Sequence, residues 1–413
     1  MLTKKNIFLI TSLLYVLYTL FPLFADLTRI PVWLPSIAPV VVMALLYPKA
    51  FANKTFYWFL VYALVLVSYL MLGRPLTIGI GTVDDSKKII IEFAFILPSI
   101  SIFCILHYLK DEVLTRRLVN WSIGILFVSF IVAVPLMQRY GSLRAALSEE
   151  TVEAAMAEVS VPGLPGYPLM HAYTLFLPVL CYGVKAFGGT KKWWALGGLL
   201  VLCFVVYDTF VTTSLILMIA TIIFTVFYSD KGNALFFIIF GVIAIAIYIL
   251  YEAGAFISLI DWMLPAFEGT PVESKLNDFK DSMLQGHITG LTITERMDFH
   301  DVSKQAFYNN QIIGTSVAGG HSSILDRLGG MGLVGALPFI MMFVTVLRQT
   351  YKLYTTKLAK TFFFVGIVVG FVFLYNKGLF GSEGWLVYTV LMPMGIMVFE
   401  QHFLGKKSIN NEQ

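Results

Sequence analysis

The sequence predicts an all-α fold, a polytopic membrane helix bundle of about twelve transmembrane helices with a large, partly helical outer loop. Of the 413 residues, 58% are hydrophobic and only 13% are charged, whereas a soluble protein carries about a quarter charged residues. The apolar residues also form blocks, many of about 17–22 residues, long enough to cross a hydrocarbon core of about 30 Å. A soluble fold could not bury so many blocks, which excludes the soluble classes.

The apolar blocks predict spans at residues 6–25, 31–48, 55–73, 89–109, 117–137, 167–186, 193–209, 211–228, 233–251, 330–348, 361–376 and 383–400. The N-terminal block resembles a signal peptide, but it lacks a small-residue cleavage site and further spans follow it. We therefore expect an uncleaved first helix. Little more than Asp208 and Thr209 separates the seventh and eighth spans, so one kinked element is an alternative for that pair.

Lysine and arginine in the loops predict the orientation of the bundle. Every second inter-span segment is short and basic, and this set holds 17 of the 29 lysines and arginines. The alternate segments are longer and hold most of the acidic residues. We therefore expect the first set and both termini to be cytoplasmic. The predicted organisation is nine spans over residues 1–251, a large outer loop over 252–329, and three spans with a cytoplasmic tail over 330–413.

The large outer loop has helical signals of its own. Residues 253–267 read as a helix lying on the membrane interface, with Trp262 as its anchor. Thr292 to Glu295 forms a capping box that would begin a helix ending near Tyr308. Glycine-rich sequence then predicts an irregular turn, followed by a short helix from Ser322 to Leu328 that leads through two glycines into the tenth span.

Candidate chemistry gathers at the outer face of the bundle. The middles of the predicted spans are nearly free of charge, which argues against an ion-coupled transporter. On the first loop helix, helical spacing places Arg296, His300, Ser303 and Phe307 on one face. His321 follows the glycine-rich turn directly.

Residues 296–335 carry a run of motif residues. In order, these are Arg296, Ile313-Gly314, Gly319-Gly320-His321-Ser322-Ser323-Ile324-Leu325-Asp326-Arg327 and Gly332-Leu333-Val334-Gly335. This run resembles the signature loop of the O-antigen polymerase/ligase family, and the span count resembles that family more loosely. Thr212-Thr213-Ser214 looks like a degenerate form of a second family motif that lacks its arginine, so no role is carried over to it. The His-Ser-Ser sequence favours the polymerase branch.

The resemblance implies a metal-independent glycosyltransferase without a cofactor, in the bacterial inner membrane. Such an enzyme moves a glycan from undecaprenyl diphosphate to a lipid-linked repeat unit on the outer face. The implied partners are the undecaprenyl-diphosphate-linked oligosaccharide, membrane lipid, and flippase and chain-length regulator proteins, with no nucleic acid. Two alternatives stay open: ligase-type transfer to another acceptor, and a transporter or flippase for lipid-linked sugars.

For this reaction, we expect His321 to accept the proton of the incoming hydroxyl, with His300 as the alternate base. Arg296 is the first candidate to stabilise the diphosphate leaving group. The further substrate-binding candidates are Arg327, Lys87, Lys88, Arg139 and Arg144. Each has a simpler interpretation as well, since Arg296 could pair with a neighbouring acid and the other cations could be membrane anchors or solvated surface groups.

Overall fold

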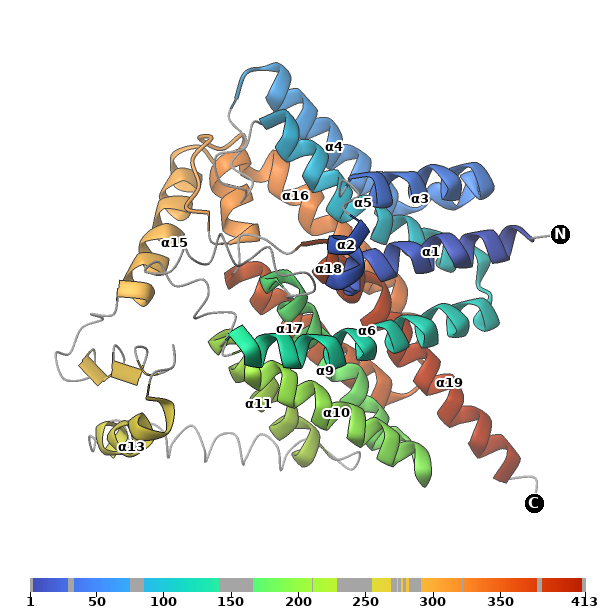
Figure 1. The fold of residues 1–413 in the computed structure, drawn as a ribbon. Coiled ribbons are helices and arrows are strands. Elements are labelled where there is room, and N and C mark those ends of the chain that lie inside the picture. Colours follow the sequence, from blue (N-terminus) through green and yellow to red (C-terminus); the bar gives the residue numbers. More distant parts are fainter. Residues whose placement is uncertain are drawn as a thin grey trace.

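The computed structural model describes residues 3–28, 33–74, 85–140, 166–209, 211–228, 255–268, 291–320, 322–376 and 381–410, with a few positions between 273 and 281. Within these ranges the secondary structure is helical throughout, without a strand (Figure 1). The predicted all-helical class is therefore confirmed for the described part of the chain.

The N-terminal half of the bundle contains most of the long helices. In chain order these are α1 (Lys4–Leu20), α2 (Pro22–Thr28), α3 (Trp33–Leu46), the 3-10 helix η1 (Pro48–Phe51), α4 (Lys54–Met71), α5 (Asp85–Leu109), α6 (Glu112–Tyr140), α9 (Tyr167–Ala186), α10 (Thr190–Asp208) and α11 (Thr212–Phe227).

The loop and the C-terminal part follow. They comprise α13 (Ala255–Met263), the 3-10 helix η3 (Leu264–Phe267), α15 (Leu291–Asn309), α16 (Ser323–Tyr351), α17 (Lys357–Asn376), α18 (Gly381–Leu386), the π-helical turn η4 (Val387–Leu391) and α19 (Met392–Asn410). The two helices predicted within the large loop, at 253–267 and from 292 to about 308, correspond to α13 with η3 and to α15. Trp262, the predicted anchor, is 78% exposed.

Eight described helices are long and apolar enough to cross a membrane, and a bent pair makes a ninth. Two of the other predicted spans coincide with shorter apolar helices, at Leu34–Leu46 and Thr213–Phe227. The predicted span 233–251 lies outside the described residues. The membrane-protein architecture is therefore supported, whereas the count of twelve spans is not established.

The first predicted span is wrong as a single straight helix. Its residues form α1 and α2, which are bent by 95° at Phe21. Pro22 begins α2, and a proline there has no backbone N–H to continue the α1 hydrogen-bond ladder. The predicted pair 193–209 and 211–228 forms two helices, because α10 ends at Asp208 and α11 begins at Thr212.

Helix α9 lies at the centre of the bundle. It contacts α10, α11, α17, α18 and α19, and 89% of its most apolar stretch is buried. By contrast, only 28% of the corresponding stretch of α4 is buried, and side chains such as Leu64 and Met71 are exposed there. Apolar side chains on the outside of a helix suit contact with lipid, so the burial pattern is that of a membrane bundle.

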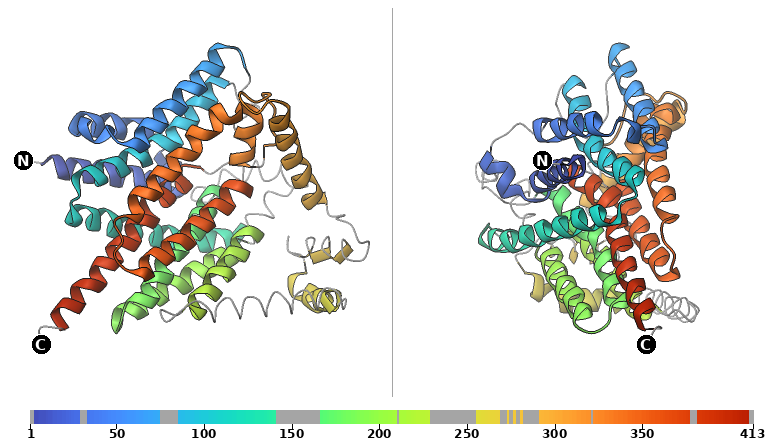
Figure 2. Two further views of the ribbon diagram at one scale, coloured as in Figure 1. Left: turned by 180° about the vertical axis from the view of Figure 1, so that it is seen from behind. Right: turned by 90° about the vertical axis from the view of Figure 1, so that its right-hand side faces the viewer.

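The two ends of the bundle differ. Figures 1 and 2 show both chain termini toward one end, and α13, α15 and the beginning of α16 toward the other. At the terminal end, Lys5 of α1 forms an ion pair with Asp111, in the turn between α5 and α6. That ammonium holds the pKa of the Asp111 carboxyl below its usual range.

Helix α16 corrects the prediction of a short helix ended by Gly329-Gly330. The helix runs through both glycines, and its only non-helical residue is Gly332, with φ 57° and ψ −160°. A Cβ at position 329 would lie 2.6 Å from the Ser303 carbonyl oxygen of α15. Gly329 therefore allows α15 and α16 to pack closely, and the break in α16 lies at Gly332.

The break at Gly332 is filled by the chain that precedes α16. In an unbroken helix, the N–H groups of Leu333 and Val334 would donate to the carbonyls of Gly329 and Gly330. Instead, Leu333 N donates to Gln311 O at 2.8 Å and Val334 N to Ile312 O at 3.0 Å. The two released carbonyls accept from Thr315 N at 2.9 Å and Ser316 N at 3.1 Å. The turn 310–317 thus supplies all four partners.

We predict that Gly332→Ala destabilises the protein. A residue with a side chain is strained at φ 57°, which costs about 1–3 kcal/mol, and its Cβ would lie 2.4 Å from the Ile312 carbonyl oxygen. The melting temperature in detergent, followed by size-exclusion chromatography of heated samples, should fall by several degrees. Gly124→Ala is the control, because a Cβ there meets nothing within 4 Å. Equal melting temperatures for the two variants would contradict the interpretation of Gly332.

Candidate functional site

The candidate site is built around the contact between α15 and the first turns of α16. Helix α15 is polar overall, yet it buries Ser303 (1% exposed) and Ala306 (5% exposed) against the bundle. Gly319 and Gly320 lie in the turn that leads from α15 to α16. Three segments therefore meet at this end of the molecule: the middle of α15, the glycine turn and the beginning of α16.

The Asp326 carboxylate joins these three segments. It is 2% exposed, and its Oδ1 accepts from Ser303 Oγ at 2.8 Å and from Gly320 N at 3.2 Å. Its Oδ2 accepts from Ser322 N at 3.0 Å. Hydrogen bonds to an ionised acceptor are stronger than neutral ones, so this carboxylate fixes the backbone on both sides of position 321.

Two small residues allow the glycine turn to approach α15 closely. Gly319 N donates to Ser303 Oγ at 2.8 Å, and a Cβ on Gly319 would lie only 2.0 Å from the Phe299 carbonyl oxygen. Gly320 has φ 85°, a conformation that side-chain-bearing residues rarely adopt. Ser322 then caps α16, since its Oγ accepts from Leu325 N at 3.1 Å. The His-Ser-Ser motif thus begins at a tightly constrained turn.

A second polar group lies on the opposite side of the same turn of α16. Arg327 is 4% exposed, and its guanidinium donates to Glu92 of α5, to Tyr62 Oη of α4 at 2.8 Å, and to Ser323 O at 2.7 Å. The Tyr62 hydroxyl donates in turn to Glu92 at 3.0 Å. The guanidinium also lies 3.8 Å from the centroid of the Phe339 ring, a cation–π arrangement.

The end of α4 holds the turn 310–317 in place. Tyr69 Oη donates to Ile313 O at 2.7 Å and lies 3.1 Å from Met331 O. The Arg74 guanidinium donates to Ile313 O at 3.1 Å and to Gly314 O at 2.9 Å, with its Cζ 5.0 Å from the Tyr69 ring centroid. These contacts connect a loop segment to a residue about 240 positions earlier in the chain.

The structure describes the three candidate catalytic residues to different extents. His300 is half-buried on α15 and packs edge-on against Tyr375 of α17, with ring centroids 5.4 Å apart. Arg296 lies one turn earlier on α15, and its side chain is outside the described part. His321 itself lies outside the described residues, although Gly320 and Ser322 on either side are held by Asp326.

The five substrate-binding candidates are dispersed. Arg327 is buried within the bundle, in contrast to the predicted position at the membrane surface. Lys87 is exposed, and Lys88 donates to Asp85 at 3.0 Å, in the first turn of α5. Arg139 lies near the end of α6 with its side chain outside the described part, and Arg144 lies outside the described residues.

Sequence reasoning missed Asp326 and Glu92 as organising residues. Asp326 stands within the motif run, four positions after Ser322, but the sequence suggested no role for it. Glu92 carried no signal, since its partner lies 235 positions away. No three His, Cys, Asp or Glu side chains are grouped to hold a metal ion in the described ranges, and the metal-independent reaction remains a prediction.

Lys304 on α15 forms an exposed ion pair, which provides a control for changes at the candidate site. Lys304 donates to Asp301 at 2.9 Å, and both side chains are about half exposed. This hydrogen bond raises the pKa of the Lys304 ammonium. Exposed pairs of this kind contribute little to stability, so changes at Lys304 or Asp301 are suitable controls for changes at the site.

We predict that Asp326→Asn loosens the glycine turn. An amide offers a single acceptor oxygen, so it cannot accept from Ser303, Gly320 and Ser322 together, and the loss is on the order of 2–3 kcal/mol. Limited proteolysis should then cut the 310–322 segment faster than in the unmodified protein. Asp301→Asn on α15 is the control and should leave the cleavage rate unchanged. Equal rates for both variants would contradict the role given to Asp326.

We also predict strong coupling between Arg327 and Glu92. Removal of one partner leaves an uncompensated buried charge, at a cost of about 3–5 kcal/mol. Arg327→Met and Glu92→Leu should each lower the melting temperature in detergent, whereas the double variant should lose much less than the sum of the two. Strictly additive losses would mean that the two side chains are independent.

Comparison with known proteins adds no relative to this picture. No protein-family model matches the chain, and no curated protein matches it at a significant level of sequence similarity.

Proposed function

We propose that this chain is a polysaccharide polymerase of the bacterial inner membrane. It would transfer a glycan from undecaprenyl diphosphate to a lipid-linked repeat unit at the outer face. In this proposal both termini are cytoplasmic, and the end of the bundle that carries α13 and α15 faces outward. The distribution of lysine and arginine in the loops supports that orientation.

One observation carries the proposal. The Asp326 carboxylate fixes Gly320 and Ser322, and Gly319 packs on the backbone of Phe299, the neighbour of His300. Position 321 is therefore next to a turn that lies against the His300 part of α15. Helical spacing puts position 296 one turn away along α15. The described motif residues Gly319, Gly320 and Ser322 thus share one hydrogen-bonded turn, which supports the proposal.

Glycan transfer requires a base for the hydroxyl proton and a group that stabilises the leaving diphosphate. The acceptor hydroxyl attacks the anomeric carbon, the bond from that carbon to the diphosphate oxygen breaks, and the hydroxyl proton must go to a base. Undecaprenyl diphosphate leaves as an anion. A histidine can accept the proton near neutral pH, which is the role assigned to His321 with His300 as alternate. A guanidinium stabilises the developing diphosphate charge, the role assigned to Arg296.

The environment of Arg327 changes its assignment within this proposal. Its guanidinium already donates to Glu92, Tyr62 and Ser323, so we assign it to positioning the beginning of α16. Lys87, Lys88, Arg139 and Arg144 keep their assignment as candidates for binding the anionic lipid headgroup. Flippase and chain-length regulator proteins remain the proposed partners, alongside membrane lipid.

The test is glycan synthesis by the purified protein. In detergent, with undecaprenyl-diphosphate repeat units and neither metal nor nucleotide sugar, we expect a ladder of polymer on a gel. Arg296→Ala and His321→Ala should each reduce the rate at least about a hundredfold, the usual loss of a general base or an oxyanion-stabilising group. Lys304→Ala changes a cation on the same helix and should retain activity.

The products separate the rival functions. Folded Arg296→Ala and His321→Ala variants that still build full-length polymer would contradict the proposal. In cells, loss of a polymerase leaves single repeat units on the surface acceptor, whereas loss of a ligase leaves long chains on undecaprenyl diphosphate. Protection of the lipid-linked sugar inside liposomes, without bond formation, would indicate a flippase.

A further inference from the structure

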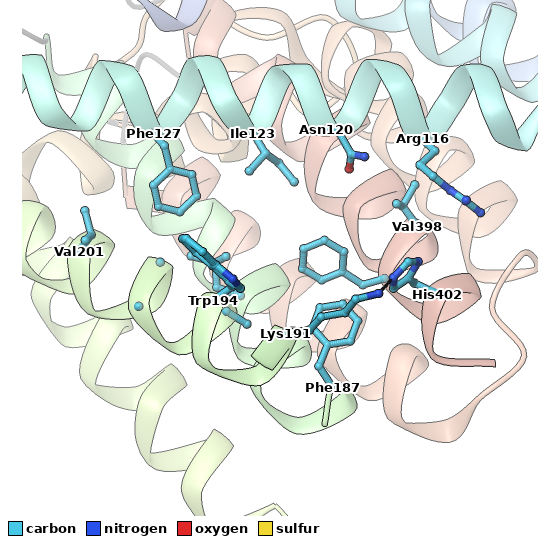
Figure 3. Close-up of a pocket in the computed structure, with 15 residues that line it drawn as sticks. Arg116, Asn120, Ile123, Phe127, Phe187, Lys191, Trp194, Val201, Val398 and His402 are labelled. Atoms are coloured by element: carbon cyan, nitrogen blue, oxygen red, sulfur yellow. Dashed lines mark hydrogen bonds between the residues drawn. The ribbon is translucent and has the colours of Figure 1, made fainter. Parts of the chain in front are cut away.

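A groove lies at the end of the bundle that holds the chain termini, away from α15. It is formed by α6, α10, the end of α9 and α19 (Figure 3) and has a volume of about 710 Å³. This volume falls within the range of about 300–1,000 Å³ that is typical of ligand sites. His300, the candidate catalytic residue whose side chain the structure describes, does not line it, and neither do Asp326 and Arg327, so the groove is distinct from the site described above.

The wall of the groove is mostly apolar. Ile123 and Phe127 of α6 face Trp194 and Val201 of α10. From Arg116 to Phe127 the groove follows α6 for about 16 Å, given a rise of about 1.5 Å per residue. That length matches half of a hydrocarbon core of about 30 Å. The groove thus has the length and polarity required by the acyl chains of one membrane leaflet.

Glycine makes the floor of the groove concave. A Cβ on Gly198 would lie 2.7 Å from the Phe127 ring, so the ring rests on bare backbone there. A Cβ on its neighbour Gly197, which also lines the groove, would meet nothing within 4 Å. Among the described residues, the space above Gly197 is therefore open. Trp194, beside it, is 78% exposed.

Nitrogen groups gather at one end of the groove. Figure 3 shows Arg116, Lys191 and His402 together at the end opposite Phe127 and Val201. Lys191 Nζ donates to His402 Nε2, and Asn120 lies one helical turn from Arg116. Among the described residues, those that line the groove include no Asp or Glu. The groove therefore joins an apolar wall to a cationic end that has no acidic lining residue to neutralise it.

We propose that this groove binds an anionic diacyl phospholipid of the membrane. The acyl chains would lie along Ile123, Phe127, Trp194 and Val201, and the phosphate would accept hydrogen bonds from the cationic end. Charge complementarity selects an anionic headgroup. The long apolar wall selects a lipid over a free phosphate ion, because the ion would leave that surface uncovered. By the predicted orientation, the lipid belongs to the cytoplasmic leaflet.

The test measures lipid selectivity at Trp194. The protein is reconstituted with phosphatidylcholine that carries brominated acyl chains, which quench nearby tryptophan fluorescence, and unbrominated phosphatidylglycerol is titrated in. The part of the signal lost in Trp194→Phe reports the groove. We expect phosphatidylglycerol to relieve this quenching at low mole fraction. The double variant Arg116→Gln/Lys191→Gln should weaken the preference roughly thirtyfold, since each cation contributes about fivefold.

The controls change the neighbouring residues. Arg117→Gln/Lys192→Gln removes the same two charges from exposed positions that do not line the groove, and it should keep the preference. Gly197→Leu fills the open space without changing charge and should also abolish the preference, whereas Gly124→Leu, outside the groove, should not. Equal relief of quenching by phosphatidylcholine and phosphatidylglycerol would overturn the proposal. So would relief by inorganic phosphate alone, or equal losses in the two double variants.

Discussion

The structure depends on a constraint that the membrane imposes on the backbone of α16. A helix interrupted inside a bilayer exposes N–H and C=O groups for which lipid offers no partner. At Gly332 these groups bond to residues 311–316, which return the loop into the bundle and replace the missing rungs of the ladder. Residues 311–316 of the large loop therefore complete the backbone hydrogen bonding of α16 at its break.

This constraint explains why several glycines are concentrated in one part of the chain. Gly314 and Gly332 have φ values of 67° and 57°, and a Cβ at either position would lie within 2.6 Å of the opposing backbone. Gly319 and Gly329 allow the chain to approach α15 in the same way. The glycine-rich sequence that predicts an irregular turn is thus a densely packed junction between two helices, and its rigidity would suit the proposed role of positioning a base.

The first turn of α16 also joins two polar systems of different character. Asp326 turns toward α15 and the glycine turn, whereas the next residue, Arg327, turns toward α4 and α5. The Arg327 charge is balanced by Glu92 within the bundle, but the Asp326 carboxylate is balanced by hydrogen bonds from Ser303 and two backbone N–H groups. One turn of α16 therefore connects the glycine turn and α15 to α4 and α5.

The sequence predicted those features that depend on local pattern. The apolar blocks predicted helices at eleven of the twelve expected positions, and the twelfth lies outside the described residues. The sequence also predicted a helix from Thr292 to about Tyr308, and α15 begins one residue earlier, at Leu291. It did not predict the Arg327–Glu92 pair, because no periodicity relates residues 235 positions apart. It also assigned the helix break to Gly329-Gly330 instead of Gly332, since composition does not distinguish a glycine needed for φ from one needed for close packing.

In the two proposals, both ends of the bundle bind an anionic lipid group beside apolar helices, and their cations differ. At the α15 end, the described cations Arg74 and Arg327 are committed to internal carbonyls and to Glu92, so a substrate there would rely on side chains of the loop. At the terminal end, Arg116 and Lys191 border an apolar groove that has no acidic lining. Cations bonded to carbonyls and a carboxylate give a fixed framework, whereas Lys191 is bonded only to the His402 ring among the described residues. Under the two proposals, the reaction would use the fixed framework at the loop, and the lipid would bind at the opposite end.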